Sequence, residues 1–146
     1  PDITPSPSPM PQPTRGAAAP NPLRLLYVED NRINALLFEE AMRMLGGIDL
    51  QVAEDGADAM RLVQDWTPQV LVLDANLPDM SGHEVLRRLR TRPELARLPA
   101  FMCSADAMPE DIQRARDAGF DGYWTKPIEM SAVSAAIEAL RSTTPA

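Results

Sequence analysis

Apolar runs alternate with helical patterns five times between Leu23 and Arg141, and this alternation constrains the fold more than any other feature of the sequence. Short apolar runs indicate strands, and apolar residues three or four apart indicate helices. Strands joined by helices form a parallel sheet, because a parallel pair needs a long crossover connection. We therefore predict a doubly wound (βα)5 sandwich of the α/β class, with a parallel five-stranded sheet of order 2-1-3-4-5.

The predicted strands differ in polarity, which indicates their places in the sheet. The third, QVLVLDA, has an unbroken apolar run and belongs at the centre, whereas the second, DLQVAE, is more polar and belongs at an edge. The predicted strands occupy residues 23–29, 49–54, 69–75, 99–105 and 120–126.

The predicted helices begin and end at ordinary signals. The first covers residues 32–45 and ends at a pair of glycines, with Asp30 or Asn31 as its N-cap. Ser81 can cap the third helix, and Pro109 stands in the first turn of the fourth. The second and fifth helices are marked by apolar residues at helical spacing: Ala57, Met60, Val63 and Trp66, then Met130, Val133, Ile137 and Leu140.

The first 22 residues differ in composition from the rest of the chain. They hold eight of the 15 prolines and almost no large apolar side chains, so they cannot bury enough surface to offset the entropy of ordering. We predict a flexible linker at residues 1–22, a folded domain at 23–142 and a tail at 143–146. The chain starts at Pro1 rather than Met, which indicates a piece of a longer protein, or a processed or cloned end.

Composition argues against several functional classes. The formal charge is −7, from 14 basic and 21 acidic side chains, and the lack of a Lys- or Arg-rich run argues against nucleic acid binding. No segment approaches the roughly 18 apolar residues that span a bilayer, so we expect no membrane contact by this domain. The single cysteine, Cys103, lies in an apolar run, which indicates an inert buried side chain in a reducing compartment. We therefore expect a cytoplasmic domain, although its parent protein could be membrane-anchored.

Polar residues end four of the predicted strands. Glu29 and Asp30 end the first, Asp74 the third, Ser104 the fourth and Lys126 the fifth. In open α/β sheets, ligands bind outside the carboxyl ends of the strands, where the strand order reverses. The order 2-1-3-4-5 makes the first and third strands neighbours, so the three carboxylates should converge.

Converging carboxylates need a positive charge or a proton among them. Two carboxylates about 4 Å apart repel by roughly 4 kcal/mol at an effective dielectric constant of 20. Oxygen ligands with partial access to solvent favour a hard divalent ion, most plausibly Mg²⁺. Lys126 and the hydroxyl of Ser104 add a charge and a donor suited to a bound phosphoryl group.

Four segments, YVEDN, LVLDANLPDMSG, CSAD and GYWTKPI, resemble in order and spacing the receiver domains of two-component signalling proteins. The resemblance covers roughly four-fifths of the chain and implies a flavodoxin-like fold. The run SADAMPEDIQRARDAGFDGYWTKPI is most similar to receivers at the C-terminal end of hybrid sensor histidine kinases. A stand-alone single-domain response regulator is the alternative setting.

The resemblance implies a role for each polar residue at the strand ends. Asp74 would be the phosphoacceptor, taking a phosphoryl group from a phosphorylated histidine kinase or histidine phosphotransfer domain. Asp30, Asp74 and the backbone carbonyl of Asn76 would bind Mg²⁺, and Glu29 would act largely through a water. Lys126 would pair with the acceptor carboxylate and then with the phosphoryl oxygens. Such a domain catalyses only its own phosphorylation and autodephosphorylation, so whether to class it as an enzyme stays open.

The resemblance also implies a switch. Ser104 would hydrogen-bond the phosphoryl group and Tyr123 would change rotamer, which alters the surface of the fourth helix, fifth strand and fifth helix. That surface could also form a weak homodimer. Asn76 and Asp106 stand at positions that tune autodephosphorylation in the family. The Lys126–Pro127 peptide bond would be cis.

Two other functional classes fit the sequence less well. A haloacid dehalogenase-type phosphatase also uses an aspartate nucleophile with Mg²⁺, but its acid pair comes late in the chain, whereas Glu29 and Asp30 come first. A receiver that works without phosphorylation is disfavoured because every acceptor-site residue is present. Glu29 replaces the commoner Asp, which adds one methylene to the side chain beside the metal. Ser104 replaces the commoner Thr but keeps the hydroxyl that the switch needs. His83, at the start of the third helix, is interpreted as a solvent-exposed residue.

Overall fold

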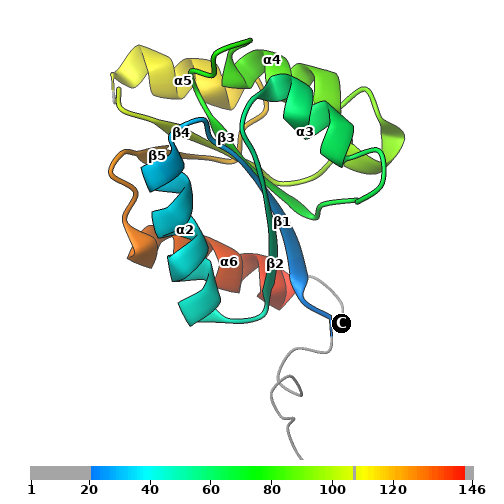
Figure 1. Ribbon diagram of the computed structural model, residues 1–146. Helices are drawn as coiled ribbons and strands as arrows, with labels where there is room; N and C mark the ends of the chain where they lie inside the picture. Colours follow the sequence, from blue (N-terminus) through cyan, green and yellow to red (C-terminus); the bar gives the residue numbers. More distant parts are fainter. Residues whose placement is uncertain (1–20, 107, 144–146) are drawn as a thin grey trace, which may run out of the picture.

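The computed structural model describes residues 21–106 and 108–143. In this part of the chain, five parallel strands form a sheet of order β2-β1-β3-β4-β5 with helices on both faces, which confirms the predicted fold class (Figure 1). The predicted linker and tail lie almost wholly outside the described residues. The strands are β1 (Leu23–Val28), β2 (Ile48–Ala53), β3 (Val70–Asp74), β4 (Ala100–Ser104) and β5 (Gly122–Thr125). The helices are α2 (Arg32–Leu45), α3 (Gly56–Leu62), α4 (Gly82–Leu89), α5 (Pro109–Asp117) and α6 (Met130–Thr143), with a short 3-10 helix at Pro93–Leu95.

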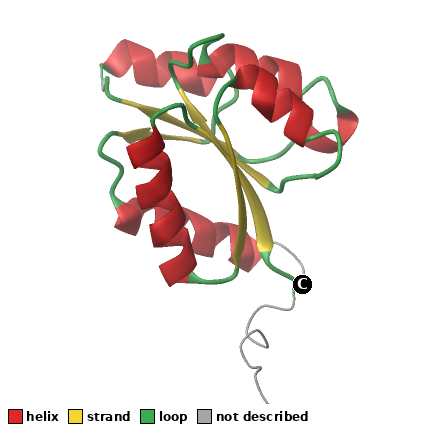
Figure 2. Cartoon of the chain, viewed as in Figure 1, coloured by secondary structure: helices red, strands yellow, loops and turns green. Residues whose placement is uncertain are grey.

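Helices lie on both sides of the sheet (Figure 2). The sheet separates two apolar layers, one on each side. Side chains alternate along each strand, so neighbouring residues enter different layers. Leu71 and Leu73 of β3 pack with α3, α4 and α5, while Val70 and Val72 pack with α2 and α6. Every residue of β3 is buried and β2 is mostly half-buried, so the predicted central and edge strands are confirmed.

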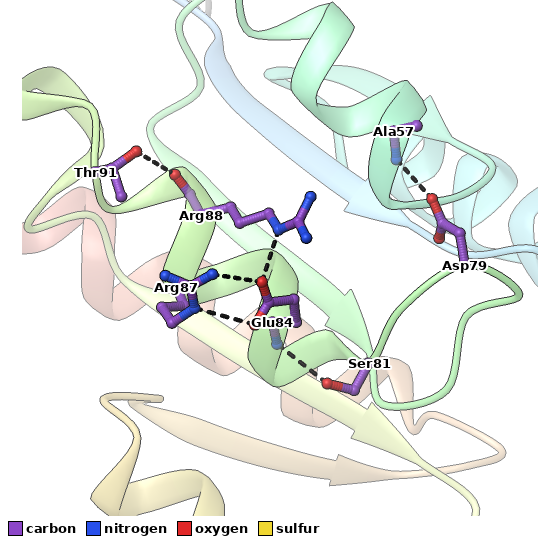
Figure 3. Close-up of polar contacts among 7 residues, drawn as sticks. All are labelled: Ala57, Asp79, Ser81, Glu84, Arg87, Arg88 and Thr91. Carbon is purple, nitrogen blue, oxygen red and sulfur yellow. Dashed lines mark hydrogen bonds and ion pairs between the residues drawn. The ribbon is translucent and has the colours of Figure 1, made fainter.

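The helix termini follow the predicted signals. The side-chain oxygen of Asn31 accepts a hydrogen bond from the N–H of Asn34, so Asn31 and not Asp30 is the N-cap of α2. Ser81 caps α4 by accepting from the N–H of Glu84 (Figure 3). Pro109 opens α5, as predicted. Within the described residues, no helix combines the length and the apolar character needed to cross a bilayer.

Some predicted boundaries are wrong. The second predicted helix extends to Trp66, but α3 ends at Leu62 and the chain leaves it through tight turns, with Asp65 N–H bonded to the carbonyl of Leu62. Trp66 nevertheless packs against the same apolar layer, because a turn beyond a helix can cover the same face. The fifth strand is shorter than predicted and begins at Gly122, after Phe120 has bonded back to the end of α5.

Candidate functional site

The carboxyl ends of β1, β3 and β5 bring three charged side chains into contact. Glu29 follows β1, Asp74 ends β3 and Lys126 follows β5. The Nζ atom of Lys126 lies 2.9 Å from Oε1 of Glu29 and 3.2 Å from Oδ1 of Asp74. The side chain of Glu29 is fully buried, that of Asp74 is 7% exposed and that of Lys126 is 19% exposed. One lysine therefore serves two buried carboxylates.

Backbone contacts determine where Asp74 lies. It pairs with Cys103 of β4 at the end of the sheet, and the chain then turns back, with the N–H of Gly82 bonded to the carbonyl of Ala75. A Cβ atom at position 82 would lie only 2.4 Å from the carbonyl oxygen of Asp74. Glycine is therefore required where α4 begins against the end of β3.

The three charges shift one another's pKa values. Burial, together with the charge of Glu29, raises the pKa of Asp74 to about 6. Burial also acts to raise the pKa of Glu29, but hydrogen bonds from Lys126 and from the N–H of Asn31 outweigh it and lower that pKa. Burial opposes the charge on Lys126, yet Glu29 and Asp74 outweigh it and raise the lysine pKa. The negative charge of Asp74 is thus less well stabilised by its neighbours than that of Glu29.

Asp30 adds a third carboxylate on the solvent side. Its side chain is exposed, and one oxygen from each of Glu29, Asp30 and Asp74 lies within 4.8 Å of the others. Like charges this close favour a bound cation. Oxygen ligands with one side open to solvent suit Mg²⁺, which keeps several of its waters. The residues present therefore fit the predicted metal.

Glu29 is the least available of the three carboxylates. Its Oε1 accepts a hydrogen bond from the hydroxyl of Tyr27 at 2.9 Å as well as from Lys126, and its Oε2 accepts from the N–H of Asn31 at 3.1 Å. This arrangement fits the expected water-mediated contact with a metal better than a direct one. Tyr27 was missed from the sequence, although residues two apart on a strand share a face.

A second polar group lies beside the carboxylates. The N–H of Asp106 donates to Oγ of Ser104 at 3.1 Å, and the hydroxyl of Tyr123 donates to the carbonyl of Asp106 at 2.7 Å. These three residues line a hollow together with Asn76, whose N–H lies 3.5 Å from Oδ1 of Asp74. Residues from β3, β4 and β5 and the loops that follow β3 and β4 therefore meet at one edge of the sheet.

Three further predictions about individual residues have clear outcomes. Cys103 is buried, and burial raises the pKa of its thiol, as expected of an inert cysteine. The Lys126–Pro127 peptide bond is cis, as predicted. The prediction for His83 is wrong: it is half-buried, with its ring edge-on to Phe120 at a centroid distance of 5.6 Å, because the first turn of α4 packs against the segment before β5.

Comparison with known proteins agrees with this geometry. Residues 25–138 match the family described as the response regulator receiver domain. This chain belongs to the receiver domain family. Receiver domains accept phosphoryl groups from histidine kinases or phosphotransfer proteins and bind Mg²⁺ at an acidic site. The acidic cluster of this receiver consists of Glu29, Asp30 and Asp74.

The relatives of this receiver differ in size. The gliding motility regulatory protein of Myxococcus xanthus is 36% identical over 126 residues, which cover 86% of this chain but only 16% of that protein. The polar-differentiation response regulator DivK of Brucella anthropi is 32% identical over 109 residues, covering 75% of this chain and 88% of DivK.

A solved structure provides a third comparison. It is the receiver domain of sensor histidine kinase PA1611 from Pseudomonas aeruginosa PAO1, described with a magnesium ion coordinated in its active site cleft. It is 25% identical to this receiver, with a TM-score of 0.73, and the match covers 81% of this chain and 96% of that one. Membership of the receiver family leaves the phosphatase alternative without support.

In this receiver, Tyr27→Phe should lower the free energy of unfolding by about 1–3 kcal/mol, because it removes a donor from a carboxylate that stays buried. Urea unfolding at neutral pH measures the change. Tyr123→Phe is the matched control, because the Tyr123 hydroxyl donates to a carbonyl in an exposed loop. This variant should lower the free energy of unfolding by less than about 1 kcal/mol. Equal losses in the two variants would contradict a buried Tyr27–Glu29 contact.

Proposed function

We propose that this receiver takes a phosphoryl group from a phosphohistidine onto Asp74. The observation that carries the proposal is the nearly buried Asp74 carboxylate at the end of the central strand, 3.2 Å from the Lys126 ammonium. A carboxylate is already ionised at pH values above its pKa, so its attack needs charge neutralisation more than an added base. Lys126 supplies part of that neutralisation.

The proposed step forms one bond and breaks another. An oxygen of Asp74 attacks phosphorus, the bond from phosphorus to the donor imidazole nitrogen breaks, and the imidazole leaves with that electron pair. Asp30, Asp74 and the carbonyl of Asn76 would hold Mg²⁺, with Glu29 acting through a water, and the bound ion would neutralise phosphoryl oxygens. Lys126 stays close enough to exchange its carboxylate contact for one with the new phosphoryl group.

Ser104, Asp106 and Tyr123 are proposed to transmit the phosphorylation of Asp74 to the surface of the domain. Ser104 would leave its bond with Asp106 to donate to the phosphoryl group, and Tyr123, whose hydroxyl holds the same loop, would change rotamer. These movements would alter the surface of α5, β5 and α6, the output face and the place for a weak homodimer. Asn76 and Asp106 would set the rate of autodephosphorylation.

Two parent contexts are proposed for this domain. The likeness to the receiver of a sensor histidine kinase supports a receiver within a hybrid sensor kinase. The alternative, a single-domain response regulator, is supported by the match that covers nearly all of DivK. In both contexts, we propose that the domain works in the cytoplasm.

An exposed apolar face on α2 is the proposed docking surface for the phosphohistidine donor. Ile33, Leu36 and Leu37 are 69%, 51% and 65% exposed and stand at helical spacing. Leu36 borders the same groove as Asp30, and Leu37 lines a small pocket with Lys126. Clustered exposed apolar side chains mark interaction sites, and this cluster adjoins two residues of the site, Asp30 and Lys126.

The central prediction is a covalent adduct on Asp74. With Mg²⁺ and acetyl phosphate, intact mass measurement should show the mass of one added phosphoryl group, which Asp74→Ala should lack. Removing Mg²⁺ with a chelator should reduce adduct formation strongly. A wild-type protein that stays unmodified, or an adduct that persists in Asp74→Ala, would refute the proposed acceptor. Continued hydrolysis of an external phosphomonoester would instead indicate a phosphatase.

The docking proposal predicts a difference between phosphoryl donors. Leu37→Asp should slow transfer from a phosphorylated histidine phosphotransfer domain by about tenfold or more, because a charge replaces an apolar contact. The rate with acetyl phosphate should stay within about twofold of wild type, since that donor needs no docking surface. Met44→Asp is the matched control, an exposed apolar residue near the far end of α2, and should behave as wild type. Equal slowing by both variants would contradict docking at Leu37.

A further inference from the structure

The loop between β3 and α4, residues 75–81, is tied to the start of α3 by Asp79. One carboxylate oxygen of Asp79 accepts from the N–H of Gly56 and the other from the N–H of Ala57, both at 2.9 Å. Figure 3 shows the bond to Ala57 crossing from the loop to α3. The partners are 23 and 22 residues apart in sequence, so this contact joins two elements rather than stabilising a local turn.

These two hydrogen bonds provide acceptors for the first two N–H groups of α3. The first N–H groups of a helix have no partners within it. The side chain of the N-cap residue, Asp55, accepts a hydrogen bond from the N–H of Asp58. The N–H groups of Gly56 and Ala57 donate to Asp79 instead. The two bonds lower the pKa of Asp79, so it is ionised at neutral pH. A charged acceptor at a helix N-terminus is favourably placed.

Packing strengthens the same connection. The side chain of Met80 lies so close to Gly56 that a Cβ atom there would come within 2.5 Å of the Met80 sulfur. Within the loop, the N–H of Leu77 donates to the carbonyl of Met80. A β-bridge joins Asn76 to Ser81. The loop is therefore a closed unit, held to α3 by a polar contact and an apolar one at neighbouring positions.

The loop contacts the acceptor at its other end. The N–H of Asn76 points to Oδ1 of Asp74 at 3.5 Å, and Asn76 also supplies the carbonyl proposed to bind Mg²⁺. We infer that Asp79 is a positioning residue: by tying the loop to α3, it holds Asn76 in place against Asp74. This inference rests on the proposed function of the site, but it concerns a residue of the LVLDANLPDMSG segment to which the resemblance assigns no role.

The test compares Asp79→Ala and Asp79→Asn with a matched control. Glu84→Gln alters another carboxylate close to the loop, in the first turn of α4, whose ion pairs are with Arg87 and Arg88 of its own helix (Figure 3). Three measurements would be made on wild type and on each variant. They are amide hydrogen exchange in the metal-free protein, calorimetric titration with Mg²⁺, and the rate of acetyl phosphate labelling across Mg²⁺ concentrations.

We expect Asp79→Ala to speed exchange at the amides of Gly56 and Ala57 and across the loop. The dissociation constant for Mg²⁺ should rise about tenfold, as is typical when a residue supporting metal ligands is removed. The labelling rate at saturating Mg²⁺ should stay within about twofold of wild type, so the defect is in binding rather than in the chemical step. Asp79→Asn, which keeps one acceptor oxygen, should be intermediate, and Glu84→Gln should match wild type.

A folded Asp79→Ala protein with wild-type Mg²⁺ affinity would overturn the inference, even if it were less stable. If Asp79→Ala does not fold, Asp79→Asn decides, and wild-type affinity there would overturn it equally. Failure of the inference is distinguishable from failure of the proposed function. In the first case wild type binds Mg²⁺ and forms the adduct while the Asp79 variants match it, and in the second wild type itself forms no adduct.

Discussion

The contact of Lys126 with two buried carboxylates is the interaction around which the functional site is built. One ammonium faces Glu29 at 2.9 Å and Asp74 at 3.2 Å, while Asp30 adds a third negative charge nearby. Glu29 has two further donors, Tyr27 and Asn31, so Asp74 bears most of the uncompensated charge. An ordinary core would not keep such an arrangement, because unpaired buried charge is destabilising. The excess negative charge is instead suited to attract a metal ion.

The fold concentrates these charges without disturbing its two apolar layers. The strand order places β1 beside β3, so residues that follow two central strands meet at one edge of the sheet. β3 is buried along its whole length and delivers Asp74 at its last position. Gly82 lets α4 begin directly against that residue, and Asp79 holds the intervening loop to α3. The site is thus built from the ends of regular strands and from one loop, residues 75–81, that is hydrogen-bonded to α3.

The sequence predicts most of this architecture, and the parts it does not predict have physical reasons. Strand order, the central position of β3 and the convergence of the strand-end charges follow from apolar patterns and parallel-sheet rules. The length of α3 does not, since Trp66 keeps its helical spacing while the backbone has already turned. The half-buried state of His83 and the contact of Asp79 with α3 depend on which loops meet in three dimensions. Local patterns carry no information about such meetings.

The most direct test of the uncompensated charge on Asp74 compares the free energy of unfolding of wild type and Asp74→Asn across pH, with and without Mg²⁺. Because the pKa of Asp74 rises from 3.8 to about 6 on folding, its stabilising effect is fully present below pH 4 and is lost as the pH rises through 6. The metal-free Asn variant should therefore be more stable than wild type at pH 7.5 by about 2–3 kcal/mol, with the advantage fading towards pH 4. Saturating Mg²⁺ should reduce the advantage by stabilising wild type. A metal-free Asn variant that is equally or less stable at pH 7.5 would contradict the claim that Asp74 is kept at a cost to stability.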